Sequence, residues 1–254
     1  MPPSSKWADG PWSLLQTPSA TKDVTHHSAH HIANEMASAH NAMIRGLNAI
    51  YLQAPNIPTT SPQTVADFLF FVATWSGWIM HHHVMEETML FPGFEEVPGV
   101  KKGVMEANVE QHHAFLEGLE GLNTYARTTK PEDYDGKGVR ATLEIFGDAL
   151  RTHLADEIGT LWALDCVASE HAKKLQDVYD KCEAEAMKQS KFEVPPMVMG
   201  LCDRTYEGRD WPTMPAIADY VINYVFAWRH RGAWRFLPSD HFRRPRKLPF
   251  VEES

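Results

Sequence analysis

The chain of 254 residues has little cysteine, with three residues at positions 166, 182 and 202. An odd number at wide, unpatterned spacing excludes the disulfide framework that stabilises many small secreted domains. This usage is typical of a reducing compartment. It also disfavours cysteine as a metal ligand.

Long apolar runs are also missing. No stretch of the sequence approaches the roughly 20 consecutive apolar residues that a membrane-spanning helix needs. The segment 1–7 lacks the apolar run behind a basic start that marks a secretory signal. We therefore expect a cytoplasmic protein with no membrane partner.

Basic residues are too few for a nucleic-acid-binding surface. The formal net charge is -9, which argues against nucleic acid and against anionic membranes as partners. The segment 241–247 is a local basic exception, and we interpret it as a solvated end of the chain.

Strand-like alternation with hairpin turns is absent, whereas apolar residues recur at helical spacing. Helices are predicted over about 25–53, from 61 to a stop at 91–93, over 101–126 and over 139–164. The polar stretch 169–189 either continues the last helix or forms another. Four long helices joined by short loops indicate an all-α, up-down-up-down four-helix bundle.

Three regions follow from this pattern. Residues 1–21 form an N-terminal tail that packs through Trp7 and Trp12 without a fold of its own, and residues 22–190 form the bundle. Residues 191–254 form an aromatic and proline-rich C-terminal extension that packs on the bundle. We expect the extension to contain one further helix near 215–230 and to cover one mouth of the site described next.

A histidine pattern occurs twice in the bundle. His40 precedes His82-x-x-x-Glu86, and His112 precedes His153-x-x-x-Glu157. A histidine and a carboxylate four residues apart lie on the same helical face, so each pair can direct two ligands at one ion. Each lone histidine adds a third ligand. Two such half-sites predict a two-metal centre bridged by Glu86 and Glu157.

Adjacent histidines require a choice of register. The residues three, four, seven and eleven positions before His82 are more apolar than those before His83, so His82 is predicted to lie on the drier face. The same test directs His112 inward and His113 outward. Whether His83 is also a ligand stays open. Glu87 and Asp156 are interpreted as solvated or supporting acids, and the remaining histidines are assigned to surface or capping roles: His26, His27, His30, His31, His81, His171, His230 and His241.

The full candidate set favours iron. Neutral imidazoles suit iron, zinc or copper, while bridging carboxylates suit iron or manganese, so two non-haem iron ions are expected, with zinc as the main competitor. The candidate metal ligands are His40, His82, His83, Glu86, His112, His153 and Glu157.

Four motifs resemble the hemerythrin family, in its HHE cation-binding branch, over residues 25–170. They are His40-Asn-Ala-Met-Ile-Arg, His82-His-Val-Met-Glu-Glu-Thr-Met-Leu-Phe-Pro, Glu110-Gln-His-His-Ala-Phe-Leu and His153-Leu-Ala-Asp-Glu. The resemblance implies that His40, His82, His112 and His153 are terminal iron ligands and that Glu86 and Glu157 bridge the ions.

The chain departs from the oxygen-carrying members at two positions. Those proteins have a further histidine where this chain has Asn108, and their last carboxylate is an aspartate one position later. In some HHE proteins a carboxylate at the position of His83 makes up the missing ligand. These departures put reversible oxygen carriage in doubt.

Two functions remain open at this stage. A di-iron pair with an open coordination position can pass electrons to O2, which predicts an oxidoreductase that activates O2 to oxidise an unidentified small organic substrate. The alternative is a non-catalytic O2-binding, O2- or iron-sensing, or iron-storage protein. Structural zinc is disfavoured because such sites usually hold one tetrahedral ion.

Overall fold

The computed structural model describes residues 8–251, so Trp7 lies outside the described residues. Within that range the regular elements are helical, apart from one isolated bridge between Ser239 and Pro245. The all-α prediction is confirmed. None of the described helices has both the length and the apolar character needed to cross a membrane.

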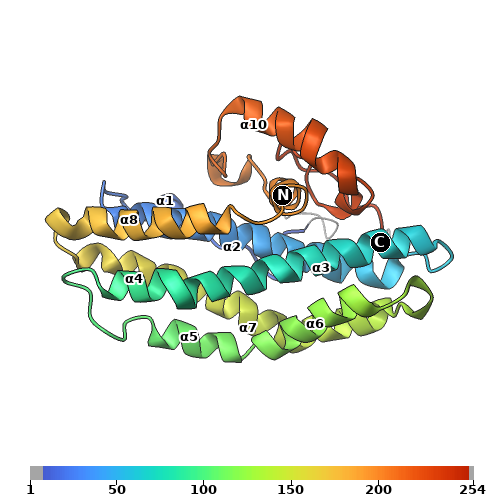
Figure 1. Ribbon diagram of the computed structural model, residues 1–254, viewed down its shortest axis with the longest axis horizontal. Helices are drawn as coiled ribbons and strands as arrows, with labels where there is room; N and C mark the ends of the chain where they lie inside the picture. The colour runs from blue at the N-terminus through green and yellow to red at the C-terminus, as the bar shows by residue number, and fades with distance from the viewer. Residues whose placement is uncertain (1–7, 252–254) are drawn as a thin grey trace.

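Four helical columns form the bundle (Figure 1). They are α2 (Ser28–Gln53), α3 (Pro62–Met85), the pair α5 (Glu106–His113) and α6 (Leu116–Thr128), and α7 (Gly136–Trp162). Helix α2 packs on α3 and α7, while α6 packs on α3 and α7, so the columns close a ring around the core. The predicted up-down-up-down bundle is confirmed.

The boundaries of these helices follow from local chemistry. His27 caps α2 by accepting a hydrogen bond from the Ala29 amide, and Pro62 occupies the first position of α3, where a missing N–H costs nothing. Asp135 caps α7 by accepting from the Gly138 amide at 2.9 Å. The short 3₁₀ segments η1 (Ala54–Asn56) and η3 (Pro131–Asp133) lie in the connections.

The second column does not stop at residues 91–93 as predicted. After α3 the chain makes the π-helical segment η2 (Glu86–Leu90) and continues as α4 (Phe91–Glu95). The Phe91 amide donates to the Glu86 carbonyl, five residues back. Pro92 therefore falls in the first turn of a new helix, where proline is tolerated.

The third column is also divided, whereas a single helix over 101–126 was predicted. Phe115 leaves helical geometry with φ −126° and is almost fully buried. Its ring lies 4.9 Å from the ring of His83 and 5.4 Å from that of His153, between centroids. Packing of this one side chain inside the bundle accounts for the break.

The N-terminal segment is fixed along α2 by three asparagines spaced seven residues apart. Asn48 bonds the backbone of Ala8 and Trp12, Asn41 bonds both backbone groups of Leu15, and Asn34 accepts from the Ser19 amide. The segment includes the short helix α1 (Pro18–Thr21). Trp12 packs against Gly147, as expected of a tail that packs through tryptophan.

Beyond α7 and η4 (Ala163–Cys166), the separate helix α8 (Ser169–Ala186) packs on α2, η2 and α4.

The extension follows α8, and its contacts run along α2 and α3 (Figure 1). Helix α8 thus covers η2, which carries Glu86, whereas the extension was expected to cover one mouth of the site. The extension contains α9 (Val194–Leu201), η5 (Tyr206–Gly208), α10 (Ala216–Val221), the π segment η6 (Ile222–Phe226), η7 (Ala227–His230) and η8 (Ala233–Phe236).

The basic segment 241–247 is not simply a solvated end. Arg243 is buried and pairs with Asp210 and Asp219, and Arg246 donates to the carbonyls of Leu237 and Trp234. Each guanidinium presents several donors in a fixed fork, which lets it join separate loops. These two arginines fasten the end of the extension to itself.

Candidate metal centre

Seven predicted side chains converge inside the bundle from five elements. His40 comes from α2, the neighbouring His82 and His83 from α3 and Glu86 from η2, while α5 and α7 supply the remaining three. Six of them are buried, and the side chain of His82 is 18% exposed. The full set is His40, His82, His83, Glu86, His112, His153 and Glu157.

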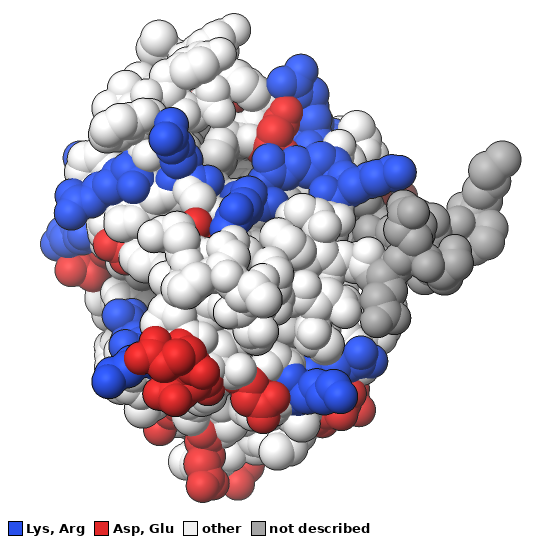
Figure 2. Space-filling view, turned by 90° about the vertical axis from the view of Figure 1, so that its right-hand side faces the viewer, with Lys and Arg blue, Asp and Glu red and all other residues white. Residues whose placement is uncertain are grey.

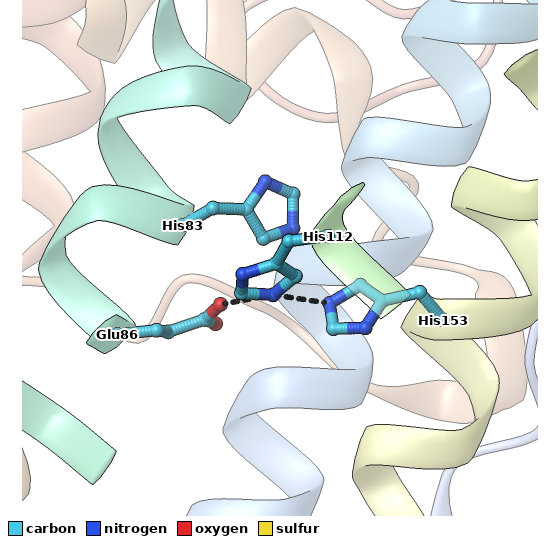
Figure 3. Close-up of side chains that lie close together, drawn as sticks. All are labelled: His83, Glu86, His112 and His153. Atoms are coloured by element: carbon cyan, nitrogen blue, oxygen red, sulfur yellow. Dashed lines mark hydrogen bonds and ion pairs between the residues drawn. The ribbon is translucent and has the colours of Figure 1, made fainter. Parts of the chain in front are cut away.

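These side chains form two groups in which the potential ligand atoms all lie within 4.8 Å of one another. The first group is His40, His82, Glu86 and Glu157. The second group is His83, Glu86, His112 and His153, and Figure 3 shows His112 lying between the other three. Glu86 belongs to both groups, so its carboxylate is placed to be shared by two ions.

The grouping differs from the two half-sites expected from the sequence. His153 and Glu157 fall into different groups, although Glu157 Oε2 lies 3.8 Å from His153 Nε2 and 3.4 Å from His40 Nε2. His83 fills the place expected for Glu157 in the second group. It is also more buried than His82, so the prediction that His82 takes the drier face was wrong.

Three imidazoles are held from outside by acceptors on their Nδ1 atoms. His40 Nδ1 lies 2.7 Å from the Leu154 carbonyl, His112 Nδ1 lies 2.5 Å from Glu87 Oε1, and His153 Nδ1 lies 3.3 Å from Gln111 Oε1. An acceptor on one ring nitrogen selects the tautomer whose other nitrogen is a lone-pair donor. All three Nε2 atoms therefore carry lone pairs that could bind a cation, and those of His112 and His153 lie 3.1 Å apart.

Supporting contacts of this kind were only partly foreseen. Glu87 was interpreted as a solvated or supporting acid, and its carboxylate, although exposed, reaches His112. The contact of Gln111 with His153 was missed, as was the bond that Gln111 Nε2 donates to Asp156 Oδ2 at 2.8 Å. Their positions in the sequence could have indicated these contacts. Gln111 directly precedes His112, and Asp156 directly precedes Glu157.

The interior of the site holds buried polar atoms that make no hydrogen bond of acceptable geometry. They are His40 Nε2, His82 Nε2, both ring nitrogens of His83 and both carboxylate oxygens of Glu86 and of Glu157. Burying such atoms without partners is costly, so native proteins pair them or use them to bind ions. The residues present fit a metal site.

Burial shifts the pKa values of these groups in opposite directions. Desolvation lowers the pKa of His40 to about 3, of His82 to about 4 and of His153 to about 2. Desolvation also raises the pKa of Glu86 and Glu157 well above the usual range of a carboxyl. The imidazoles are thus held in the neutral, ligand form, and ionised carboxylates here need nearby positive charge.

A cavity of about 700 Å³ lies beside the second group, between the η2–α4 segment and α5. Its lining combines apolar side chains with carboxylates: Phe91, Pro92, Met105, Ala107, Val109, Glu87, Glu95, Glu106 and Glu110. Because Glu87 also contacts His112, this cavity adjoins the cluster.

The other histidines mostly match their predicted roles. His113 is exposed and His27 caps α2. His30 was wrongly placed at the surface: it is buried, stacks on Trp162 with 3.7 Å between ring centroids, and lies 3.1 Å from Asp165 Oδ2.

Comparisons with known proteins agree with this site. The model of the hemerythrin HHE cation-binding domain matches residues 31–164, a range that contains every candidate ligand. The chain is also 37% identical over 250 residues to dimeric xanthone biosynthesis cluster protein R11 of Cryptosporiopsis sp. (strain 8999), covering 96% of this chain and 93% of that protein. No solved structure matches the chain. This protein belongs to the hemerythrin family, as a member with an HHE cation-binding domain.

Proposed function

We propose that this chain is a non-haem di-iron protein that activates O2 to oxidise a small organic substrate. The observation that carries the proposal is the set of buried nitrogen and oxygen atoms, without hydrogen bonds of acceptable geometry, in two adjoining groups that share Glu86. Neutral imidazoles with bridging carboxylates are a donor set that iron accepts well. Two ferrous ions held there would supply electrons to O2.

In this proposal the chain's own residues divide the work. Glu86, in both groups, would contribute ligand oxygens to both ions, and Glu157 would add negative charge between the groups. Glu87 and Gln111 fix the ring orientations of His112 and His153. Phe115 packs against the imidazoles and excludes water from the second group.

The cavity beside Glu87 supports a substrate site. Its volume of about 700 Å³ is in the range of small-molecule pockets, and its lining combines apolar side chains with four glutamates, which suits an organic molecule that has polar groups as well as an apolar part. The name of the relative in Cryptosporiopsis refers to biosynthesis of a dimeric xanthone, which is consistent with a role in small-molecule chemistry.

A second candidate function is a non-catalytic protein that binds or senses O2, or stores iron. The candidate ligands favour this function, since they comprise five imidazoles and two carboxylates. Di-iron enzymes that cleave O2 mostly use more carboxylates than this. Zinc is the competing metal for the same reason.

The two functions separate in one experiment. The protein is loaded anaerobically with ferrous iron, O2 is admitted, and O2 consumption and visible absorption are followed, with zinc-loaded protein as the control. The proposal predicts O2 consumption that continues when reductant is supplied. A lasting absorption band that disappears on deoxygenation would instead establish O2 binding without catalysis.

A further inference from the structure

Half of the large hydrophobic side chains that the described residues expose lie within one twelve-residue segment of the extension. These five residues recur at the three- and four-residue spacing of a single helix face and are called the aromatic stripe below. They are Ile217, Tyr220, Tyr224, Val225 and Trp228, each more than half exposed. Isolated exposed apolar residues are ordinary, whereas a contiguous row of this kind marks an interaction surface.

The helix that carries the stripe is fixed by its opposite face. Ile222 and Ala227 are buried, and η6 packs against α9. On the outer face Tyr220 and Tyr224 stack, with 6.3 Å between ring centroids and planes 19° apart. The stripe is therefore held outward by packing from behind.

Arginines stand at both ends of this face. Arg229 lies over the ring of Phe192, at 5.6 Å, and Phe192 packs against Phe226. At the other end Arg244 lies over the ring of Phe242, at 5.2 Å, and Phe242 packs edge-on against Tyr220. Aromatic side chains thus connect each of these arginines to the helix of the stripe.

The charge of this region is opposite to that of the bundle. Residues 216–250 contain seven arginines and lysines against two aspartates, while residues 1–190 contain 14 basic and 25 acidic residues. Asp219 and Asp240 pair with Arg243 and Arg244, and Arg235 pairs with Asp67 of α3. Arg246 donates to backbone carbonyls. Among the described residues of this segment, the exposed Arg229, Arg231 and Lys247 therefore carry the positive charge that no ion pair offsets. Figure 2 shows Lys and Arg side chains in a band beneath a largely uncharged upper part of the molecule, while Asp and Glu side chains lie mainly in the lower half, with other Lys and Arg side chains beside them.

We infer that the aromatic stripe and its arginines dock the protein on an anionic lipid surface. Trp and Tyr prefer the boundary between headgroups and acyl chains, and arginines beside them gain attraction from anionic lipids. A second copy is a poorer occupant, because an antiparallel twofold contact across the stripe would bring Arg229 at one end near Arg244 at the other end of the second copy. The net charge of the whole chain, -9, conceals this surface, so composition alone predicts no membrane partner.

The test is co-sedimentation of the full-length protein with vesicles of phosphatidylcholine containing 30% phosphatidylserine, and with vesicles of phosphatidylcholine alone. The protein should bind the mixed vesicles and bind far less to the neutral ones. Arg229→Gln/Arg231→Gln should weaken binding about thirtyfold. Tyr224→Ser/Trp228→Ala should weaken it at least about tenfold, since both apolar anchors are lost.

Matched controls use exposed residues of the bundle. Ile145→Ala removes an exposed apolar side chain from α7, and Lys174→Gln removes a basic one from α8, and both should bind as the wild type does. Equal binding to both vesicle types, or wild-type binding by the stripe variant, would overturn the inference. So would the absence of vesicle binding together with self-association that Tyr224→Ser/Trp228→Ala abolishes, because that result assigns the stripe to a second copy.

Discussion

At the scale of single residues, the site depends on groups that hold the imidazoles from outside. The Glu87 carboxylate accepts from His112 Nδ1, the Leu154 carbonyl lies on His40 Nδ1 and Gln111 lies on His153 Nδ1. Such partners set both the ring orientation and the basicity of the inward nitrogen. Glu87 is the one of the three that is charged and open to solvent.

Replacing Glu87 tests this arrangement. Glu87→Ala should weaken metal binding at the second group by about 10- to 100-fold, because His112 loses the acceptor that fixes its ring. Glu87→Gln keeps an acceptor and should lose less. The measurement is a chelator competition titration with ferrous iron. Glu110→Ala, which removes another carboxylate of the same cavity, is the control; equal losses for both variants would contradict the role of Glu87.

Thiol reactivity gives a second prediction at this scale. Burial raises the pKa of Cys182 to about 11 and of Cys202 to about 12, whereas Cys166 is exposed. At pH 8 the two buried thiols stay protonated, and only the thiolate is nucleophilic. Ellman's reagent should therefore titrate one thiol per native chain and all three after denaturation. Rapid reaction of a second thiol in the native protein would refute this.

The sequence located the site but not its internal pairing. Spacing of four residues and apolar neighbours identified His40, His112 and His153 as inward residues, and all three are buried. The choice between His82 and His83 failed because the two positions lie about 100° apart on a helix. Both imidazoles reach the cluster, His82 in the first group and His83 in the second. The apolar residues near them in sequence do not show which histidines of other helices they face.

At the scale of elements, the two irregular turns of the bundle lie at the site. The π segment η2 begins at Glu86, and the division between α5 and α6 directs Phe115 onto the imidazoles. The sequence predicted continuous helical periodicity through the second break, since no glycine or proline lies between Glu106 and Leu116. Contacts between columns determine both the π segment η2 and the break between α5 and α6. The sequence of one column alone does not predict such contacts.

Close packing of α2 on α3 gives a prediction about stability. A Cβ atom on Gly46 would lie 2.2 Å from the indole of Trp75, which donates to the Met43 carbonyl. Gly46→Ala should therefore lower the free energy of unfolding by about 1–3 kcal/mol, through displacement of the indole. Gly121→Ala in α6 meets nothing within 4 Å and should raise it by up to about 1 kcal/mol. Urea unfolding of both apo variants measures the difference, and equal midpoints would contradict the packing.

At the scale of the whole molecule, the bundle was predictable and its surroundings were not. Helical periodicity, four columns and short loops determine the ring of α2, α3, α5–α6 and α7. The position of α8 over η2 and the path of the extension along α2 and α3 depend on contacts between residues far apart in sequence. The same holds for the basic face of the extension, which a net charge of -9 conceals.

Metal binding should stabilise the whole bundle, because its candidate ligands come from elements of all four columns. A ligand that binds only the folded state adds about 4 kcal/mol at a thousandfold excess over its dissociation constant. The melting temperature should rise on adding ferrous iron to the apo protein under anaerobic conditions. Glu86→Ala, which removes the residue common to both groups, should abolish most of that rise. An unchanged rise in this variant would place the metal elsewhere.

The most direct test of the account is the number of iron ions bound per chain after anaerobic loading and gel filtration, in the wild type and in three variants. The account predicts two ions for the wild type and for His113→Ala, whose side chain is exposed. It predicts one ion for His40→Ala, which disrupts the first group, and one for His153→Ala, which disrupts the second. A single ion in the wild type, or loss of iron from His113→Ala with none from His153→Ala, would contradict a two-ion centre at these residues.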